Sequence, residues 1–263
     1  MGFIISIVNN KGGVGKSTVS ANLADALGRL GKRVLFIDMD SQSNSTFLLK
    51  GDEVVMRDTL YELLMEDGDI SSFIYTTKYQ NVWLLPNVEE TAAIEPELIR
   101  GAPDSYFRLR DKLRQYAIEN FDYTLIDDPP NMGTFVLMSL CASDFALVPI
   151  KAGSTFSIQG LVRAVQRIKE VSENYNHDLR FLRLLINMVD RRTVVGKATV
   201  TQVKDLFSAT EVFETIIPVN AAFESAESAR ETILRFDSSS TGAKAIRSLA
   251  EELIVILESE AML

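Results

Sequence analysis

The sequence predicts an α/β fold, in which a single domain over residues 1–263 holds a mostly parallel, twisted sheet with helices on both faces. Three observations predict this class. Strand and helix patterns alternate from end to end, as they do when helices connect parallel strands. Hydrophobic residues make up 46% of the 263 residues, which is enough for a sizeable core. The first strand pattern also runs directly into a glycine-rich turn and a helix, a tight connection typical of such sheets.

Apolar or β-branched runs bounded by Gly, Pro, Asn or Asp mark the expected strands. They are Phe3–Val8, Arg33–Asp38, Val82–Leu85, Tyr123–Ile126, Phe145–Ile150, Leu182–Asn187 and Val212–Ile217. Between them, apolar residues at helical spacing predict the helices. These are Ser17–Leu30, Tyr106–Glu119, Ile158–Glu173, Thr199–Leu206 and Lys244–Leu257. Residues 47–105 show the weakest pattern, and we expect short helices and loops there over one edge of the sheet.

The composition excludes several classes of protein. The single cysteine, Cys141, cannot form an intramolecular disulfide framework or a thiolate cluster. No apolar run approaches the ~18 residues of a membrane span, and no signal-peptide pattern precedes the first strand. The net charge is −9, yet residues 161–204 carry 9 basic and 4 acidic side chains. We therefore expect a cytoplasmic protein with one basic segment that is able to face a polyanion.

The segment NNKGGVGKSTV, residues 9–19, has the pattern of a phosphate-binding loop. Its glycines let successive N–H groups converge on one point, and the following helix directs its positive end to the same point. Lys16 is placed to neutralise β- and γ-phosphates, and the Ser17 hydroxyl to bind Mg²⁺. The general spacing G-x-x-x-x-G-K-[ST] has glycine where this chain has Asn10, and a second lysine, Lys11, opens the loop.

This variant resembles the deviant Walker A box, x-K-G-G-x-G-K-[ST], of the ParA/MinD superfamily of P-loop ATPases. The resemblance implies that ATP and Mg²⁺ are the ligands and that Lys11 reaches across a homodimer to the partner's nucleotide. It also implies that Lys11 and Lys16 act in catalysis. The expected ATP-binding residues of the loop are Lys11, Gly12, Gly13, Val14, Gly15, Lys16, Ser17 and Thr18.

A second motif, DMDSQSNST over residues 38–46, follows the second expected strand. Since the carboxyl ends of strands line the ligand crevice of an open α/β sheet, these acids should fall beside the loop. The segment resembles the family's D-x-D-P-Q-G-N-x-T, in which the second acid, here Asp40, orients the attacking water. Ser41 and Ser43 stand where the family has proline and glycine, which changes the stiffness of this loop while both carboxylates remain.

A third motif is the run YTLID followed by DPPNMG, which has a Walker B pattern. Its aspartate, Asp127, is expected to hold Mg²⁺ through water, opposite Ser17. The segment resembles the family's D-x-P-P-[SN]-L-G, with Asp128 in the variable position. The two prolines fix an extended loop, which suits a switch that senses the γ-phosphate.

Two further segments resemble parts of the family that surround the base. In LLINMVDRRT, residues 184–193, Asn187 is the implied amide partner of adenine, and the turn at Pro218 is implied to lie near the ring. The resemblance covers nearly the whole chain and is weakest over residues 47–105. We expect no N-terminal helix-turn-helix extension, so the chain resembles the short, Soj-like form.

The resemblance implies a Mg-dependent ATPase that closes as a homodimer around two nucleotides and is stimulated by a ParB-like adaptor. The implied role is plasmid or chromosome partition, with non-specific DNA binding by the ATP-bound dimer. Binding of that kind would be electrostatic and would fall steeply with salt. The candidate DNA contacts are Arg191, Arg192, Lys197, Lys204, Arg230, Arg235, Lys244 and Arg247.

Two alternatives stay open, because residues 218–226 lack two basic positions of the family's P-R-N-V-R-L-S-E-A. One is a ParA-like ATPase that positions a cargo other than DNA. The other is a MinD-like, membrane-associated ATPase, which needs a basic amphipathic helix at the C-terminus. Here the polar face of that helix is acidic, and anionic lipids would repel it. We therefore expect a nucleoid rather than a membrane surface.

Overall fold

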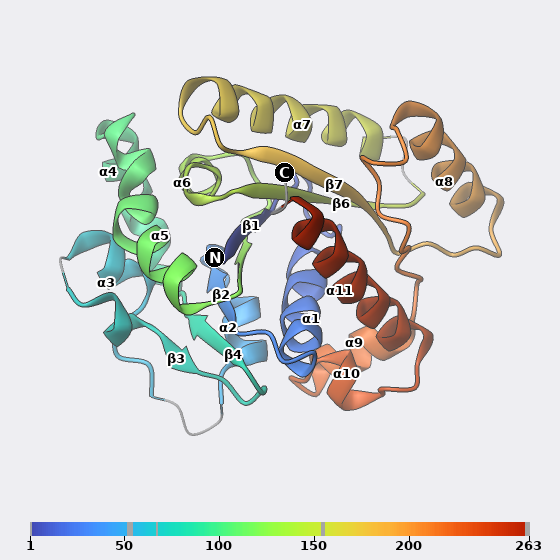
Figure 1. The fold of residues 1–263 in the computed structure, drawn as a ribbon, viewed down its shortest axis with the longest axis horizontal. Coiled ribbons are helices and arrows are strands. Elements are labelled where there is room, and N and C mark those ends of the chain that lie inside the picture. Colours follow the sequence, from blue (N-terminus) through green and yellow to red (C-terminus); the bar gives the residue numbers. More distant parts are fainter. Residues whose placement is uncertain (1, 52–54, 67, 154–155, 261–263) are drawn as a thin grey trace.

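Figure 1 shows the computed structural model, which describes residues 2–51, 55–66, 68–153 and 156–260. A seven-stranded sheet has the order β3-β4-β2-β5-β1-β6-β7. Neighbouring strands are parallel, except that β3 pairs antiparallel with β4. The strands are β1 Phe3–Ile7, β2 Val34–Asp38, β3 Tyr75–Thr76, β4 Val82–Leu85, β5 Tyr123–Asp127, β6 Phe145–Lys151 and β7 Arg180–Asn187.

Helices cover both faces of the sheet, as the sequence predicts. One buried cluster joins the sheet to α1, α2, α10 and α11, and two others join the opposite face to α3–α8. The helices are α1 Lys16–Arg29, α2 Asn44–Leu49, α3 Leu60–Met65, α4 Glu95–Arg100, α5 Arg108–Asn120, α6 Thr134–Ala142, α7 Phe156–Asn174, α8 Val194–Leu206, α9 Ala221–Ser228, α10 Ile233–Phe236 and α11 Thr241–Glu260.

The fold class and most elements are confirmed, α9 and α10 were not predicted, and the failure to predict α6 has an identifiable cause. Every residue of α6 is buried, so its sequence shows no polar face and therefore no helical period. Helix α8 begins earlier than predicted, because the Thr193 hydroxyl accepts a hydrogen bond from Gly196 N–H at 2.9 Å and caps it. Residues 47–105 form short helices, as expected, and also the edge strand β3, which the sequence did not predict.

The predicted strand Val212–Ile217 is wrong. The segment runs beside β7 and joins it through a one-residue bridge at Leu184 rather than a ladder. The carboxylate of Glu252 on α11 accepts hydrogen bonds from the backbone N–H groups of Glu214 and Thr215, at 2.7 and 2.9 Å. A side chain from a distant helix thus takes the Thr215 N–H, the donor that would continue a ladder with β7 after Phe213.

Parallel strands bring their carboxyl ends to one edge of the sheet, where the predicted motifs meet. The register aligns Ile7 of β1 and Asp38 of β2 with Asp127 of β5, which lies between these two strands. The phosphate loop and both acidic motifs therefore share one crevice. Among the described residues, no helix has both the length and the apolar character needed to cross a bilayer.

Candidate functional site

The phosphate loop joins β1 to α1 and needs glycine at two positions. Gly13 and Gly15 have φ of +70° and +83°, in the left-handed region that other residues rarely adopt. A Cβ on Gly15 would also lie 2.5 Å from Nδ2 of Asn187. Glycine at position 15 is therefore required both by the backbone conformation and by the close approach of β7.

Two buried asparagines hold the loop to the strands beside it. Asn9 donates from Nδ2 to the Pro149 carbonyl on β6 at 2.6 Å, and its Oδ1 accepts Lys11 N–H at 2.9 Å. Asn187, at the end of β7, donates to the Val14 carbonyl at 2.7 Å. The role of Asn9 was not anticipated from sequence, although a polar residue closing an apolar strand is a signal. These contacts from β6 and β7 thus help to hold the loop in shape.

Lys16 begins α1 and points into an acidic, enclosed environment. Its side chain is only 6% exposed. Burial lowers the pKa of Lys16, while the charges of Asp127, Asp128 and Asp40 act in the opposite direction. The positive charge of this ammonium group is therefore offset by the neighbouring carboxyl groups, and an anion that enters the loop can take over that role.

Asp38 and Asp127 form a buried acidic pair at the ends of the adjacent strands β2 and β5. Burial and the neighbouring Asp127 raise the pKa of Asp38 to about 8, although Thr46 donates two hydrogen bonds of 2.8 Å to Asp38 Oδ2. Burial likewise raises the pKa of Asp127, against the opposing effect of hydroxyls from Ser45 and Ser17. Two carboxylates kept this close favour a cation between or beside them.

The residues predicted to hold Mg²⁺ fit a divalent cation. Asp127 Oδ2 accepts a 2.5 Å hydrogen bond from Ser45, while its buried Oδ1 has no hydrogen-bond partner among the described residues. Ser17 lies close enough to Asp127 for its hydroxyl to lower the pKa of that carboxyl. An uncommitted carboxylate oxygen next to a serine hydroxyl is an oxygen donor set of the kind that Mg²⁺ uses beside nucleotide phosphates.

Asp40 lies in a more open position than this pair, in a turn after β2. Its N–H donates to Asp38 Oδ1 at 3.1 Å, and its own Oδ1 accepts Gln42 N–H at 3.0 Å. Ser43 has φ +55° and adopts the left-handed conformation expected for the glycine it replaces. The substitution keeps the shape of the turn at some conformational cost, and the Asp40 carboxylate lies near enough to Lys16 to raise its pKa.

Asp128, which the sequence placed in a variable position, lies on the other side of the sheet. It is 1% exposed, and its neighbours include Ser139 of α6 and Ser6 of β1. Burial holds the pKa of Asp128 well above its usual range. The residue is therefore buried at the base of the crevice, where it lies near enough to Lys16 to act on the pKa of that lysine.

The two residues predicted to read adenine are brought to neighbouring segments. Pro218 bridges Val189, two residues beyond Asn187, and Val219 N–H donates to the Val189 carbonyl at 3.1 Å. The Asn187 amide has two hydrogens and uses one for Val14, so one remains for a ligand. Asn187 thus links the end of β7, beside the Pro218 turn, to the phosphate loop.

The predicted DNA contacts do not form one cluster. In Figure 1, α8 with its lysines lies at the upper right, whereas α9 and α10 lie at the lower right. Arg192 pairs with Asp190 at 2.9 Å, and Arg235 pairs with Glu231 at 3.1 Å. The remaining candidates are distributed as follows: Arg191 lies before α8, Lys197 and Lys204 on it, Arg230 after α9, and Lys244 and Arg247 on α11.

Comparison with known proteins identifies the family. An AAA domain model matches residues 2–181. The chain is 34% identical over 254 residues to the sporulation initiation inhibitor protein Soj of Bacillus subtilis, covering 96% of this chain and 98% of that protein. It is also 34% identical to the chromosome partitioning protein ParA of Myxococcus xanthus, with 97% and 88% covered. The chain belongs to the ParA/MinD superfamily, in its Soj-like branch.

A solved structure shows the same fold. Cobyrinic acid a,c-diamide synthase from Mycobacterium smegmatis, with bound ADP and magnesium, has a TM-score of 0.83 at 28% identity, covering 99% of this chain and 97% of that chain. ParA/MinD proteins are ATPases, and the loop, Lys16 and the acids described above lie together in the crevice that their fold provides.

Proposed function

We propose that the protein is a ParA-type partition ATPase, whose Mg²⁺-dependent hydrolysis of ATP to ADP and phosphate switches a homodimer on and off DNA. The observation that carries this proposal is the phosphate loop, which is held in shape by Asn9 and Asn187 with Lys16 buried against three carboxylates. The full-length similarity to Soj and ParA proteins supports the partition role.

The phosphate loop does most of the binding. Its N–H groups and the N-terminus of α1 surround the triphosphate. Without nucleotide, the positive charge of Lys16 interacts with Asp127, Asp128 and Asp40. When ATP binds, the same charge interacts with the β- and γ-phosphates. Bound Mg²⁺ would be held by Ser17 and Asp127 and would neutralise charge on the phosphate oxygens. Thr18, next in the helix, is placed to reach the α-phosphate, and Asn187 and Pro218 lie on the base side.

Hydrolysis requires a water in line with the γ-phosphate. Asp40 accepts the water's hydrogen bond and orients its oxygen toward phosphorus, while Lys16 stabilises the charge that develops on the transferred group. The turn of residues 40–43 supports Asp40 through the N–H of Gln42, at 3.0 Å. Because this turn leaves Asp40 more open than Asp38 and Asp127, water has access to it.

Dimerisation would complete the site. Lys11 lies at the open end of the loop, where its N–H is fixed by Asn9 at 2.9 Å. When a second subunit closes over the loop, Lys11 of each subunit reaches the nucleotide bound by the other. Two triphosphates and two lysines then hold the dimer together. Loss of the γ-phosphate removes charge from this arrangement and loosens the dimer, which a ParB-like adaptor would accelerate.

The proposal is tested by following the oligomeric state and DNA retention together. Sedimentation velocity should show a monomer with ADP and a dimer with ATP and Mg²⁺, and only the dimer should be retained on arbitrary duplex DNA at low salt. Lys11→Ala should bind ATP yet stay monomeric, with Lys169→Ala, an exposed lysine on α7, as the matched control. An oligomeric state that ATP leaves unchanged in the unaltered protein would contradict the switch, and retention on anionic liposomes instead of DNA would contradict the partition role.

A further inference from the structure

A cavity extends from the phosphate loop between α1 and the α9 segment. It measures about 230 Å³. Ser17, Thr18 and Asn22 of α1 line one part of it, and Phe223, Glu227 and Arg230 line another. The lining is completed by α2, through Asn44, Ser45, Phe47 and Leu48. Helix α9 directly follows the turn that contains Pro218. The position of this segment relative to α1 and α2 therefore sets the space available beside the phosphate loop.

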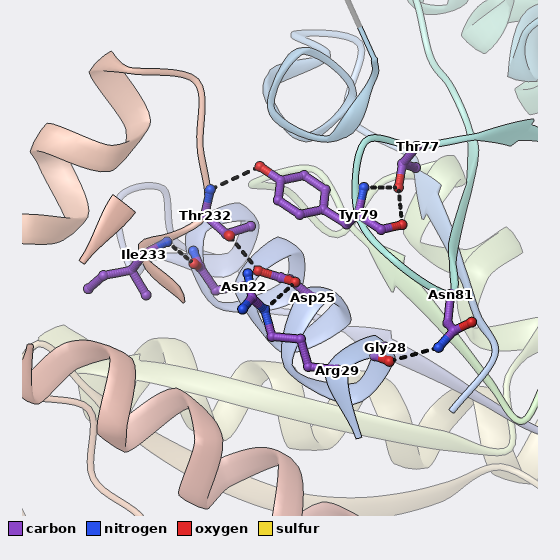
Figure 2. A network of polar contacts seen from close by, with 9 residues as sticks. All are labelled: Asn22, Asp25, Gly28, Arg29, Thr77, Tyr79, Asn81, Thr232 and Ile233. Atoms are coloured by element: carbon purple, nitrogen blue, oxygen red, sulfur yellow. Dashed lines mark hydrogen bonds and ion pairs between the residues drawn. The ribbon is translucent and has the colours of Figure 1, made fainter. Parts of the chain in front are cut away.

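A polar network fixes the end of this segment to α1 (Figure 2). The Thr232 hydroxyl donates to Asp25 Oδ2 at 2.5 Å, and the next N–H, that of Ile233, donates to Asn22 Oδ1 at 2.7 Å. Asn22 in turn donates from Nδ2 to the carbonyl of Thr18 at 2.6 Å. One continuous chain of hydrogen bonds thus leads from residue 233 to a residue of the phosphate loop.

The turn between β3 and β4 supports the same point from the outside. The Tyr79 hydroxyl accepts the N–H of Thr232 at 3.0 Å, as Figure 2 shows, and Lys78 Nζ donates to the Arg230 carbonyl at 2.5 Å. Arg230 has φ +54°, a left-handed conformation that costs free energy unless the surroundings enforce it. The turn thus holds the chain where it leaves α9.

The network is closed to water. Thr232 is 0% exposed, Asp25 2%, Asn22 3% and Tyr79 5%. A carboxylate oxygen that loses the Thr232 hydroxyl has no solvent substitute, so deleting that donor leaves a buried acceptor unsatisfied. The contact joins residues 207 positions apart in the chain, so it fixes how the two distant segments pack together.

We propose that Thr232, Asp25 and Asn22 are positioning residues for the nucleoside part of ATP: they hold the α9 segment against α1 and so set the width of the cavity beside Thr18. Of the three side chains, that of Asn22 reaches the phosphate loop, at the Thr18 carbonyl, whereas those of Thr232 and Asp25 contact each other behind it. Their loss lets the α9 segment move away from α1 and weakens binding of the nucleoside while leaving the triphosphate contacts of the loop in place. This inference rests on the proposed ATPase function.

The test compares Thr232→Val with Thr232→Ser, which keeps the hydroxyl. Affinities for ATP·Mg²⁺ and for inorganic tripolyphosphate with Mg²⁺ are measured by calorimetry, together with KM and kcat. We expect Thr232→Val to weaken ATP binding and raise KM about tenfold, the effect of one lost hydrogen bond to a buried charge. Tripolyphosphate affinity and kcat should change less than about twofold, and Thr232→Ser should restore KM.

Thr91→Val is the matched control, because Thr91 is equally buried and its hydroxyl has no hydrogen-bond partner in the part of the chain that the structure describes. It should bind ATP like the unaltered protein. Tyr79→Phe is a milder second variant in case Thr232→Val does not fold, and it should shift KM in the same direction. Equal losses for ATP and tripolyphosphate, or an unchanged KM in both Thr232→Val and Tyr79→Phe, would overturn the inference. Failure of the unaltered protein to bind ATP would instead overturn the proposed function.

Discussion

The acidic crevice and the basic surface are built in opposite ways. At the crevice, Asp38 and Asp127 are fully buried, and named hydrogen bonds from Thr46 and Ser45 fix their oxygens. The basic candidates are exposed and spread over α8 and the α9–α11 segment, and Arg192 already pairs with its neighbour Asp190. The first region acts through geometry, whereas the second can act only through summed charge. Substitutions should therefore be severe and local in the first, and graded and salt-dependent in the second.

The largest expected effect comes from removing the buried cation of the crevice. Lys16→Ala should reduce ATP affinity by at least about 100-fold, because the phosphates lose their main countercharge in an enclosed site. Calorimetric titration with ATP and Mg²⁺ measures it, with the exposed Lys169→Ala as control. Tight ATP binding by Lys16→Ala would show that this loop is not the nucleotide site.

Asp40 should separate chemistry from binding. Asp40→Ala should lower kcat by about 100-fold or more, because the attacking water loses its acceptor, while ATP affinity and the ATP-dependent dimer persist. A phosphate-release assay and sedimentation velocity measure the two properties, and Asp111→Ala on the exposed face of α5 serves as control. Normal turnover in Asp40→Ala would remove this residue from the catalytic step.

The buried acidic pair should make Mg²⁺ binding depend on pH. Since burial raises the pKa of Asp127, and raises that of Asp38 from 3.8 to about 8, the ligand-free pair holds a proton at neutral pH that the cation must displace. Mg²⁺ affinity at saturating ATP should therefore rise up to about tenfold per unit between pH 6 and pH 8. A flat profile would contradict the coupling.

The same pKa shifts predict a stability profile of the opposite sign. The native state binds protons more tightly than the unfolded state, so the ligand-free protein should become less stable as pH rises from about 4 toward 8. Thermal unfolding across this range measures the trend. Adding ATP and Mg²⁺ should reverse it, because the cation replaces the proton.

The smallest effect is expected on the basic surface. Replacing Lys197 and Lys204 of α8 by alanine should weaken DNA retention several-fold and lower the salt slope by about two, with ATP turnover unchanged. Arg192→Ala should matter less, since its guanidinium already pairs with Asp190 at 2.9 Å. Retention on duplex DNA over a salt series measures both. A larger loss for Arg192→Ala than for the lysine pair would show that geometry also governs this surface.

Local features could be predicted because their causes lie within a few residues. The glycines of the loop, the lysine at the start of α1 and the acids at strand ends follow from chain order and from the rule that parallel strands open toward one edge. Ser43 shows that even a local backbone conformation follows from the motif, because the serine adopts the left-handed conformation of the glycine it replaces. Helix α6 escaped prediction because a helix buried on all sides has no periodicity to detect.

By itself, the sequence determined the fold class, the phosphate loop, the acidic motifs and the superfamily, because each depends on short-range patterns. Only the tertiary structure decided how these parts are held. Asn9 and Asn187 fix the loop from different strands, Glu252 breaks up a would-be strand, and Thr232 meets Asp25 across 207 positions. Such contacts have no local signature, since a buried polar group finds its partner only when distant segments pack together.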